Sequence, residues 1–189
     1  KQAKMLKSSP SILHFCKVSM FVFWSMNSLG QDFIFQKVNP GTKAEIRSIK
    51  QSKQGEFFFL ANKIFALKSN QWGKLDFPVD GKVTVFYPIT ASDIWFSIDQ
   101  VTNTSMLYHF HDGITENIRS PFSNTISAIH MISPQEGIFA GVTEVAAYKN
   151  GVFTELPPLP SRDAIIKLYA DGVQYFWILT LKNELFIFQ

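Results

Sequence analysis

The sequence repeats itself about every 40 residues, and this repeat limits the possible folds more than any other feature. A short alternating run begins each copy, and the copies start 37, 43 and 39 residues apart: IRSI at 46–49, VTVF at 83–86, ISAI at 126–129 and IIKL at 165–168. A run rich in aromatic and β-branched residues follows each one: GEFFFLAN at 55–62, SDIWFSID at 92–99, EGIFAGVT at 136–143 and QYFWILTL at 174–181. This composition is typical of β-strands, and its recurrence predicts one supersecondary unit repeated along the chain.

A third apolar run follows in every copy, and two copies carry a strong hairpin signal within it. These runs are KIFALKSNQW at 63–72, MLYHFHDGIT at 106–115, VAAYKNGVFT at 145–154 and ELFIFQ at 184–189. Asp112-Gly113 and Asn150-Gly151 supply the positive φ angles that a tight β-hairpin needs. Ser69-Asn70 lies at the corresponding place in the first copy. A short fourth run then closes each of the first three units, which predicts four strands per unit.

Four short strands in ~40 residues are the size and strand count of a β-propeller blade. We therefore predict an all-β propeller with three complete four-stranded blades and part of a fourth, at about 43–80, 81–122, 123–162 and 163–189. Because the last unit has no closing strand, we expect the chain to be the N-terminal part of a larger propeller. The alternative is an antiparallel β-sandwich, which does not require a repeated hairpin signal.

Packing between blades should fall to the aromatic residues, because a small sheet with two apolar faces needs a neighbour on each side. The aromatic residues that we expect there are Phe57, Phe59, Trp95, Phe139 and Trp177. Trp95 and Trp177 should then occupy equivalent positions in their blades.

Residues 1–30 have the pattern of a secretory signal peptide. Basic residues come first, an apolar run follows at 18–26, and small Ser28 and Gly30 precede Gln31 at the spacing that signal peptidase requires. Met5 is then the natural start, with the first four residues lying upstream of it. The alternative is a buried segment of a cytosolic protein. The apolar run is too short to span a bilayer, which needs ~20 residues.

Charge and cysteine content exclude several classes of function for the remaining part, 31–189. All four basic residues before Gln31 lie in the signal-like segment, which leaves 14 basic residues against 15 acidic ones. A nucleic-acid surface needs clustered Lys and Arg, so no nucleic-acid partner is expected. The single cysteine, Cys16, lies in the signal-like segment, so residues 31–189 contain no thiol for catalysis, disulfides or metal binding.

Residues 32–189 resemble the two-component-regulator type of bacterial β-propeller. The resemblance is carried best by DIWFS at 93–97 with YHFHDG at 108–113, and next by GIFAG at 137–141 with YKNG at 148–151. The first unit departs from the pattern, since it has Phe58 where the repeat has Trp. A weaker likeness, at 153–179, is to kelch propellers, but the Gly-Gly pair of kelch strands is missing.

The resemblance implies an extracytoplasmic ligand-sensing or protein-interaction module of a bacterial signalling protein similar to a sensor histidine kinase. The transmembrane and kinase segments of that family would follow residue 189, so we expect a membrane link only through such a part. The alternatives are a secreted carbohydrate-binding or carbohydrate-active propeller and a eukaryotic kelch-like adaptor. The expected partner is a small molecule, a glycan or a protein.

Candidate binding residues lie near the loops that join strands. Asp99, Thr102 and Asn103 belong to an insertion in the second unit, and loops on a rigid scaffold often carry function. Arg162 precedes the fourth unit, where it could bind a carboxylate or a sulfated sugar. The alternative for both places is an ordinary surface loop or turn.

His109 and His111 are the candidates for a metal site, because alternation puts both on one face of a strand. The sequence places no third ligand, so we interpret them as polar residues on the solvent-facing side of an outer hairpin, with no metal or other cofactor expected. The chain has no Gly-rich phosphate loop, nucleophile elbow or His-Glu zinc helix. We therefore expect a non-enzymatic module that is exported to the periplasm or the extracellular space.

A reporter enzyme fused after Pro40 should be exported from bacteria, because the basic, apolar and small-residue regions before Gln31 form a complete export signal. Reporter activity is measured in the periplasm and in the cytoplasm. A fusion that starts at Gln31 serves as the control and should stay inside. Cytoplasmic retention of the complete fusion would contradict the predicted compartment.

Overall fold

The computed structural model describes residues 39–99 and 105–189, which form fifteen β-strands and no helix. The predicted signal peptide and part of the insertion at 99–105 lie outside the described residues. No helix that could cross a membrane occurs in the part of the chain that the structure describes.

The strands form four separate antiparallel sheets, each made from consecutive strands. The first sheet contains β1 (Ser48–Gln51), β2 (Phe57–Leu60), β3 (Ile64–Lys68) and β4 (Gln71–Lys74). The second contains β5 (Lys82–Thr90), β6 (Asp93–Asp99), β7 (Ser105–His111) and β8 (Ile114–Ile118). The third contains β9 (Ala128–Ser133), β10 (Glu136–Ala140), β11 (Val145–Lys149) and β12 (Val152–Glu155). The fourth has only β13 (Ile165–Gly172), β14 (Tyr175–Thr180) and β15 (Leu185–Phe188).

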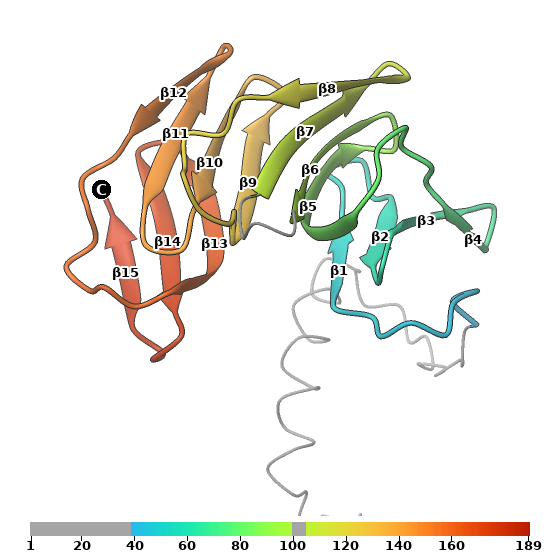
Figure 1. Ribbon diagram of the computed structural model, residues 1–189, viewed down its shortest axis with the longest axis horizontal. Coiled ribbons are helices and arrows are strands. Elements are labelled where there is room, and N and C mark those ends of the chain that lie inside the picture. The colour runs from blue at the N-terminus through green and yellow to red at the C-terminus, as the bar shows by residue number, and fades with distance from the viewer. Residues whose placement is uncertain (1–38, 100–104) are drawn as a thin grey trace, which may run out of the picture. The chain divides into compact units, whose positions relative to one another are not determined.

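The four sheets are the blades of a β-propeller, as the repeat predicts. Figure 1 shows them following one another in chain order, with β1, β5, β9 and β13 as the innermost strands. Each blade lies within one of the four predicted ranges. The predicted strand count is confirmed too, because the first three blades have four strands and the last has three.

The predicted hairpin turns adopt the backbone that their residues allow. Asp112 and Gly113 have φ of 50° and 79°, and Asn150 and Gly151 have φ of 48° and 86°. Positive φ at both central residues is the signature of the type I′ turn, whose twist matches that of the flanking strands. The first blade achieves the same geometry without glycine, since Ser69 and Asn70 have φ of 49° and 62°.

Strand pairing shows that the repeat extends to single residue positions. Four pairs join the innermost strand of each blade to the second strand at the same place: Lys50 with Phe58, Tyr87 with Trp95, His130 with Ile138, and Tyr169 with Trp177. Trp95 and Trp177 are therefore equivalent, as predicted. Because side chains alternate along a strand, this register also determines which residues face the next blade.

Three hydrophobic clusters hold neighbouring blades together. The first joins Phe58 of the first blade to Phe86 and Phe96 of the second. The second joins Trp95 to Phe139 of the third blade, and its aromatic rings meet edge to face at 5.3 Å between centroids. The third joins Ile138 and Val145 to Phe176 and Ile178 of the fourth blade. Among the described residues, no hydrophobic cluster joins the first blade to the fourth.

Three of the aromatic residues expected between blades lie elsewhere. Trp177 is not in the cluster that joins the third and fourth blades, and it packs on Tyr169 and Tyr175 of its own blade. Phe57 is 36% exposed, and Phe58 fills the contact with the second blade instead. Phe59 faces away from the second blade, where it stacks on Phe65 and meets the edge of Trp72. The expectation was wrong because alternation determines that neighbouring residues face opposite sides, whereas the position of the neighbouring blade is a property of the assembled ring.

Replacing Trp95 by alanine should lower the free energy of unfolding by about 3–5 kcal/mol, the usual cost of deleting a large buried aromatic side chain. Trp95 is fully buried and stacks on His109 with 4.2 Å between ring centroids. Denaturant unfolding measures the loss. Val152→Ala is the control, because Val152 is 62% exposed and should change stability by less than about 0.5 kcal/mol. Equal effects of the two substitutions would contradict the packing described.

Candidate functional site

A cavity of about 490 Å³ lies among the innermost strands of all four blades. This volume is within the range of ~300–1,000 Å³ that small-molecule sites usually have. The lining residues come from β1, β5, β9, β13 and the residues just before β1 and β9: Arg47, Ser48, Ile49, Lys50, Thr84, Val85, Ser127, Ala128, Ile129, Ile166, Lys167 and Leu168. The four-fold repeat thus brings together segments that lie more than 100 residues apart in sequence.

The charge of the cavity is one-sided. Arg47, Lys50 and Lys167 line it, and no acidic residue does. None of the three cations forms an ion pair with a carboxylate in the described part of the chain. Arg47 instead donates from Nε to the carbonyl oxygen of Ala61 at 3.0 Å and from a terminal nitrogen to the carbonyl of Val83. These bonds hold the guanidinium between the first two blades while its charge stays unneutralised.

Lys50 begins a stack of four residues at equivalent positions, which we call the inner stack: Lys50, Tyr87, His130 and Tyr169. The Lys50 ammonium lies 5.0 Å from the centre of the Tyr87 ring. The ring of Tyr87 lies 4.9 Å from that of His130, which lies 5.0 Å from that of Tyr169. Each member therefore packs on the member contributed by the next blade.

The surroundings of Lys50 lower its pKa. Burial, and then repulsion from Lys167, lower the pKa of Lys50 from its ordinary value of 10.5 to about 8. A nearby negative charge would have the opposite effect, because it stabilises the ammonium form. The lowered pKa thus reflects burial of the ammonium first and the neighbouring charge of Lys167 second.

His130 is kept neutral by the same surroundings. Burial, followed by the charges of Lys50 and Lys53, lowers the pKa of His130 to about 4, although its backbone contact with Ala170 opposes the shift. The hydroxyl oxygen of Tyr87 lies 3.5 Å from Nε2 of His130. Burial raises the pKa of Tyr87. At neutral pH both side chains are therefore uncharged hydrogen-bonding groups beside the cavity.

The binding residues predicted from the sequence are only loosely connected to this cavity. Asp99 accepts a hydrogen bond from Ser105 at 2.6 Å and one from Thr84 at 3.4 Å, and Thr84 lines the cavity. Thr102 and Asn103 lie outside the described residues. Asp99 thus belongs to a hydrogen-bond network that orders the end of the second blade next to the cavity.

Arg162 lines a different pocket, of about 400 Å³, beside the loop between the third and fourth blades. Glu144 and Glu155 line the same pocket. Their carboxylates make this place less favourable for an anion than the central cavity, where no acid is present. Arg162 and Asp99 are thus not part of one site, because Arg162 lines this pocket and Asp99 bonds to Thr84 of the central cavity.

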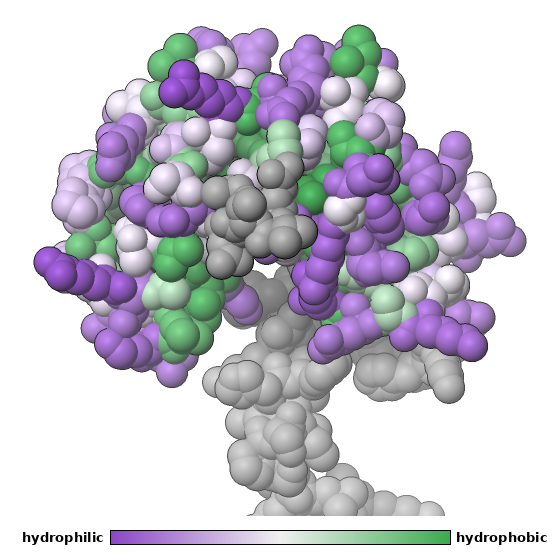
Figure 2. Space-filling view, viewed as in Figure 1, coloured by the Kyte–Doolittle hydropathy of each residue, from purple (hydrophilic) through white to green (hydrophobic). Residues whose placement is uncertain are grey.

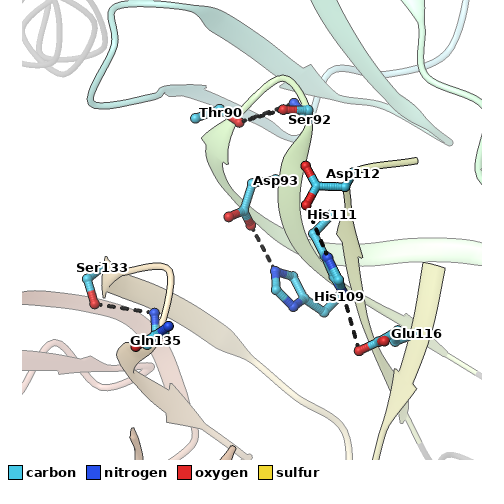
Figure 3. Close-up of polar contacts among 9 residues, drawn as sticks. All are labelled: Thr90, Ser92, Asp93, His109, His111, Asp112, Glu116, Ser133 and Gln135. Atoms are coloured by element: carbon cyan, nitrogen blue, oxygen red, sulfur yellow. Dashed lines mark hydrogen bonds and ion pairs between the residues drawn. The ribbon is translucent and has the colours of Figure 1, made fainter. Parts of the chain in front are cut away.

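His109 and His111 lie on one face of β7, as predicted, with 4.7 Å between their ring centroids. Figure 3 shows His109 pointing toward Asp93, whose carboxylate oxygen is 2.8 Å from Nε2, and His111 lying near Asp112 and Glu116. His109 is not on a solvent-facing surface, because its side chain is only 14% exposed and stacks on Trp95. The described residues contain no group of three or more His, Cys, Asp or Glu side chains placed to hold a metal ion.

The inner stack and the cavity cations were missed from the sequence. A signal for them existed, since polar or basic residues interrupt the alternating innermost strand at Lys50 and Lys167. Such residues on the strand nearest the propeller axis point toward one common space. These residues can be assigned to one space only when the innermost strand of each unit is known, and that requires recognition of the repeat.

Solved structures similar to this chain are propellers. YCF48 from Cyanidioschyzon merolae matches with a TM-score of 0.63 and 14% identity over 76% of this chain and 50% of its own. The extracellular domain of a hybrid two-component system protein, BT4673 from B. thetaiotaomicron, matches with a TM-score of 0.56 and 15% identity, over 76% of this chain and 21% of its own. PorZ, a surface component of the type-IX secretion system of Porphyromonas gingivalis, has a TM-score of 0.50 and 12% identity, over 86% of this chain and 28% of its own.

These likenesses confirm the β-propeller fold, and the resemblance to propellers of two-component regulators is confirmed at that level. The chain spans half the length of YCF48 and less than a third of the other two proteins. No protein-family model matches the chain, and no curated protein matches its sequence.

His130 should make the protein less stable in acid. Its pKa is about 4 in the folded protein and ~6.5 in an unfolded chain, so between these values the unfolded state binds the extra proton. Stability should therefore fall as the pH decreases from about 6.5 to about 4. In His130→Gln this part of the decline should be absent. The denaturant midpoints of the wild-type protein and of His130→Gln are measured at several pH values. The difference between their midpoints near pH 7 serves as the reference. An equally steep decline of both midpoints toward acid pH would contradict the prediction.

Proposed function

We propose that this propeller is an extracytoplasmic, non-enzymatic module that binds an anionic small molecule or acidic glycan in its central cavity. The observation that carries the proposal is the set of three unpaired cations, Arg47, Lys50 and Lys167, around a cavity without acidic residues. Like charges brought together cost free energy that an anion of opposite charge recovers. The ligand class is therefore a carboxylate or a sulfate, either free or carried on a sugar.

The remaining lining fits the binding of a polar organic anion. Thr84, Ser48 and Ser127 provide hydroxyl groups, and Ile129 and Leu168 provide apolar surface. Binding sites generally combine a mostly apolar wall with a few polar groups that orient the ligand. A compact organic acid or a uronic acid unit has the matching chemistry.

The export-like segment before Gln31 supports a location outside the cytoplasm. Propeller likenesses to an extracellular two-component system domain and to a bacterial surface component are consistent with it. We propose that ligand occupancy is the sensed signal, which a longer signalling protein would pass on. A secreted carbohydrate-binding propeller is the second candidate function. Binding of a neutral sugar would distinguish it from the anion-binding module.

Binding is best tested by calorimetry with four probes: sulfate, citrate, glucuronate and, as the neutral comparison, glucose. At least one anion should bind while glucose should not. Lys50→Gln and Lys167→Gln should each weaken that binding about tenfold, the usual effect of losing one charged hydrogen bond. Lys149→Gln is the matched control, because Lys149 pairs with Glu136 on an outer hairpin and should leave affinity unchanged.

The same affinity should depend on pH through Lys50. Its pKa of about 8 in the free protein means that the ammonium is lost as the pH rises past this value, so anion binding should weaken between about pH 7 and 9. Lys50→Gln should bind with little dependence on pH over this range. Binding of glucose alone would favour the carbohydrate reading, and anion binding that ignores both lysine substitutions would overturn the proposed site.

A further inference from the structure

The segment that links the third blade to the fourth forms a wall of the pocket of about 400 Å³ that contains Arg162, and we call this space the linker pocket. The opposite wall comes from Thr143 and Glu144, in the turn between β10 and β11. All of its described lining residues lie between Thr143 and Arg162, in the third blade and its linker. Figure 2 shows hydrophobic, weakly polar and strongly hydrophilic surface side by side on the left, where Figure 1 draws the loop from β12 to β13.

The linker is fixed at both ends to the segment that carries Glu144. The backbone N–H of Leu156 donates to the carbonyl oxygen of Val145 at 2.9 Å, and that of Ile165 donates to the carbonyl oxygen of Val142 at 2.8 Å. Leu156 and Leu159 also pack on the hydrophobic cluster between the third and fourth blades. Three of the five residues at 156–160 are prolines, whose rings fix φ. The wall is therefore preorganised, and a ligand would pay little conformational entropy to order it.

Charges of both signs line the linker pocket without pairing with one another. Glu144 and Glu155 provide two carboxylates, and Arg162 provides one guanidinium. Among the described residues, none of these three side chains belongs to an ion pair. Opposite charges that share one space but are held apart leave room for a ligand whose own charges lie between them.

The Glu144 carboxylate is placed by its own turn. It accepts a hydrogen bond from the backbone N–H of Thr143 at 3.3 Å. It also lies over Gly141, where an added Cβ would come within 2.9 Å of its Oε2. The turn thus holds this carboxylate on the wall that faces the linker, and the linker holds Arg162.

We propose that the linker pocket binds a dibasic amino acid, the class to which lysine, ornithine and arginine belong. The ligand carboxylate pairs with Arg162, because a guanidinium presents the planar fork of donors that matches a carboxylate. The two cationic groups of the ligand pair with Glu144 and Glu155. The aliphatic part of the ligand lies against Leu156 and Leu159, which supply the apolar part of the lining.

The balance of charge selects this class of ligand over a simple acid or amine. Two carboxylates against one guanidinium leave the pocket with an excess of one negative charge. A dibasic amino acid carries the complementary excess of one positive charge. The central cavity has the opposite character, because Arg47, Lys50 and Lys167 line it and repel such a ligand. Binding of lysine therefore reports on the linker pocket, independently of the function proposed for the central cavity.

Calorimetry on the full chain with three matched probes tests the proposal. Lysine carries all three charges, norleucine lacks the side-chain ammonium, and cadaverine lacks the carboxylate. Lysine should bind most tightly, and each of the other two should bind about tenfold more weakly, the usual effect of losing one charged hydrogen bond. Absence of lysine binding would overturn the proposal, and so would equal affinity for lysine and either of the other probes.

Substitutions assign each charge to its partner. Arg162→Gln should weaken lysine binding about tenfold without weakening cadaverine binding, because cadaverine has no carboxylate for Arg162. Glu144→Gln and Glu155→Gln should each weaken the binding of both probes. Arg119→Gln is the matched control, since Arg119 is exposed and does not line this pocket.

Circular dichroism verifies that each variant is folded before its affinities are compared. If Arg162→Gln loses affinity for cadaverine as strongly as for lysine, Arg162 does not contact the carboxylate and the proposed mode of binding is wrong. Lysine binding that is unchanged by all three substitutions in the pocket would place the ligand elsewhere and rule out the site.

Discussion

Burial of both faces of each small sheet is the constraint on which the whole structure depends. A sheet of three or four short strands cannot bury enough apolar surface alone, so stability comes from the contacts between successive blades. The second blade shows this directly: Trp95 packs toward the third blade and Phe96 toward the first, and both are fully buried. Ile49 and Leu185, whose equivalents in the neighbouring blades are buried, are 68% and 63% exposed.

The candidate site is a consequence of this packing. Stacking the blades turns one edge of every sheet toward a common space, so each innermost strand contributes to one cavity. The cavity side of these strands carries cations as well as apolar residues, with Lys50 on β1, Lys167 on β13 and Arg47 just before β1. Burial first, and then the neighbouring positive charges, lower the pKa values of both Lys50 and His130. Packing between blades and the chemistry of the cavity are therefore linked through the inner stack.

Much of the fold could be predicted because its determinants are local. Strand runs, their spacing and the Asp112-Gly113 and Asn150-Gly151 turns are all short-range signals, and the structure contains them. The site could not be predicted in the same way. Asp99 proved to be tied to the cavity only through Thr84, and Arg162 lines another pocket. Lys50 and Lys167 are 117 positions apart, and nothing local shows that they share one space.

The sequence by itself determined the blade-sized units along residues 43–189, the strands within them and the tight turns that join them, because each depends on the backbone preferences of neighbouring residues. Tertiary structure decided which face of a strand is covered, as the contrast between buried Phe58 and exposed Phe57 shows. It also decided which cations meet in the cavity. These properties depend on how one blade is placed against the next, and that placement is set by side chains distant in sequence acting together.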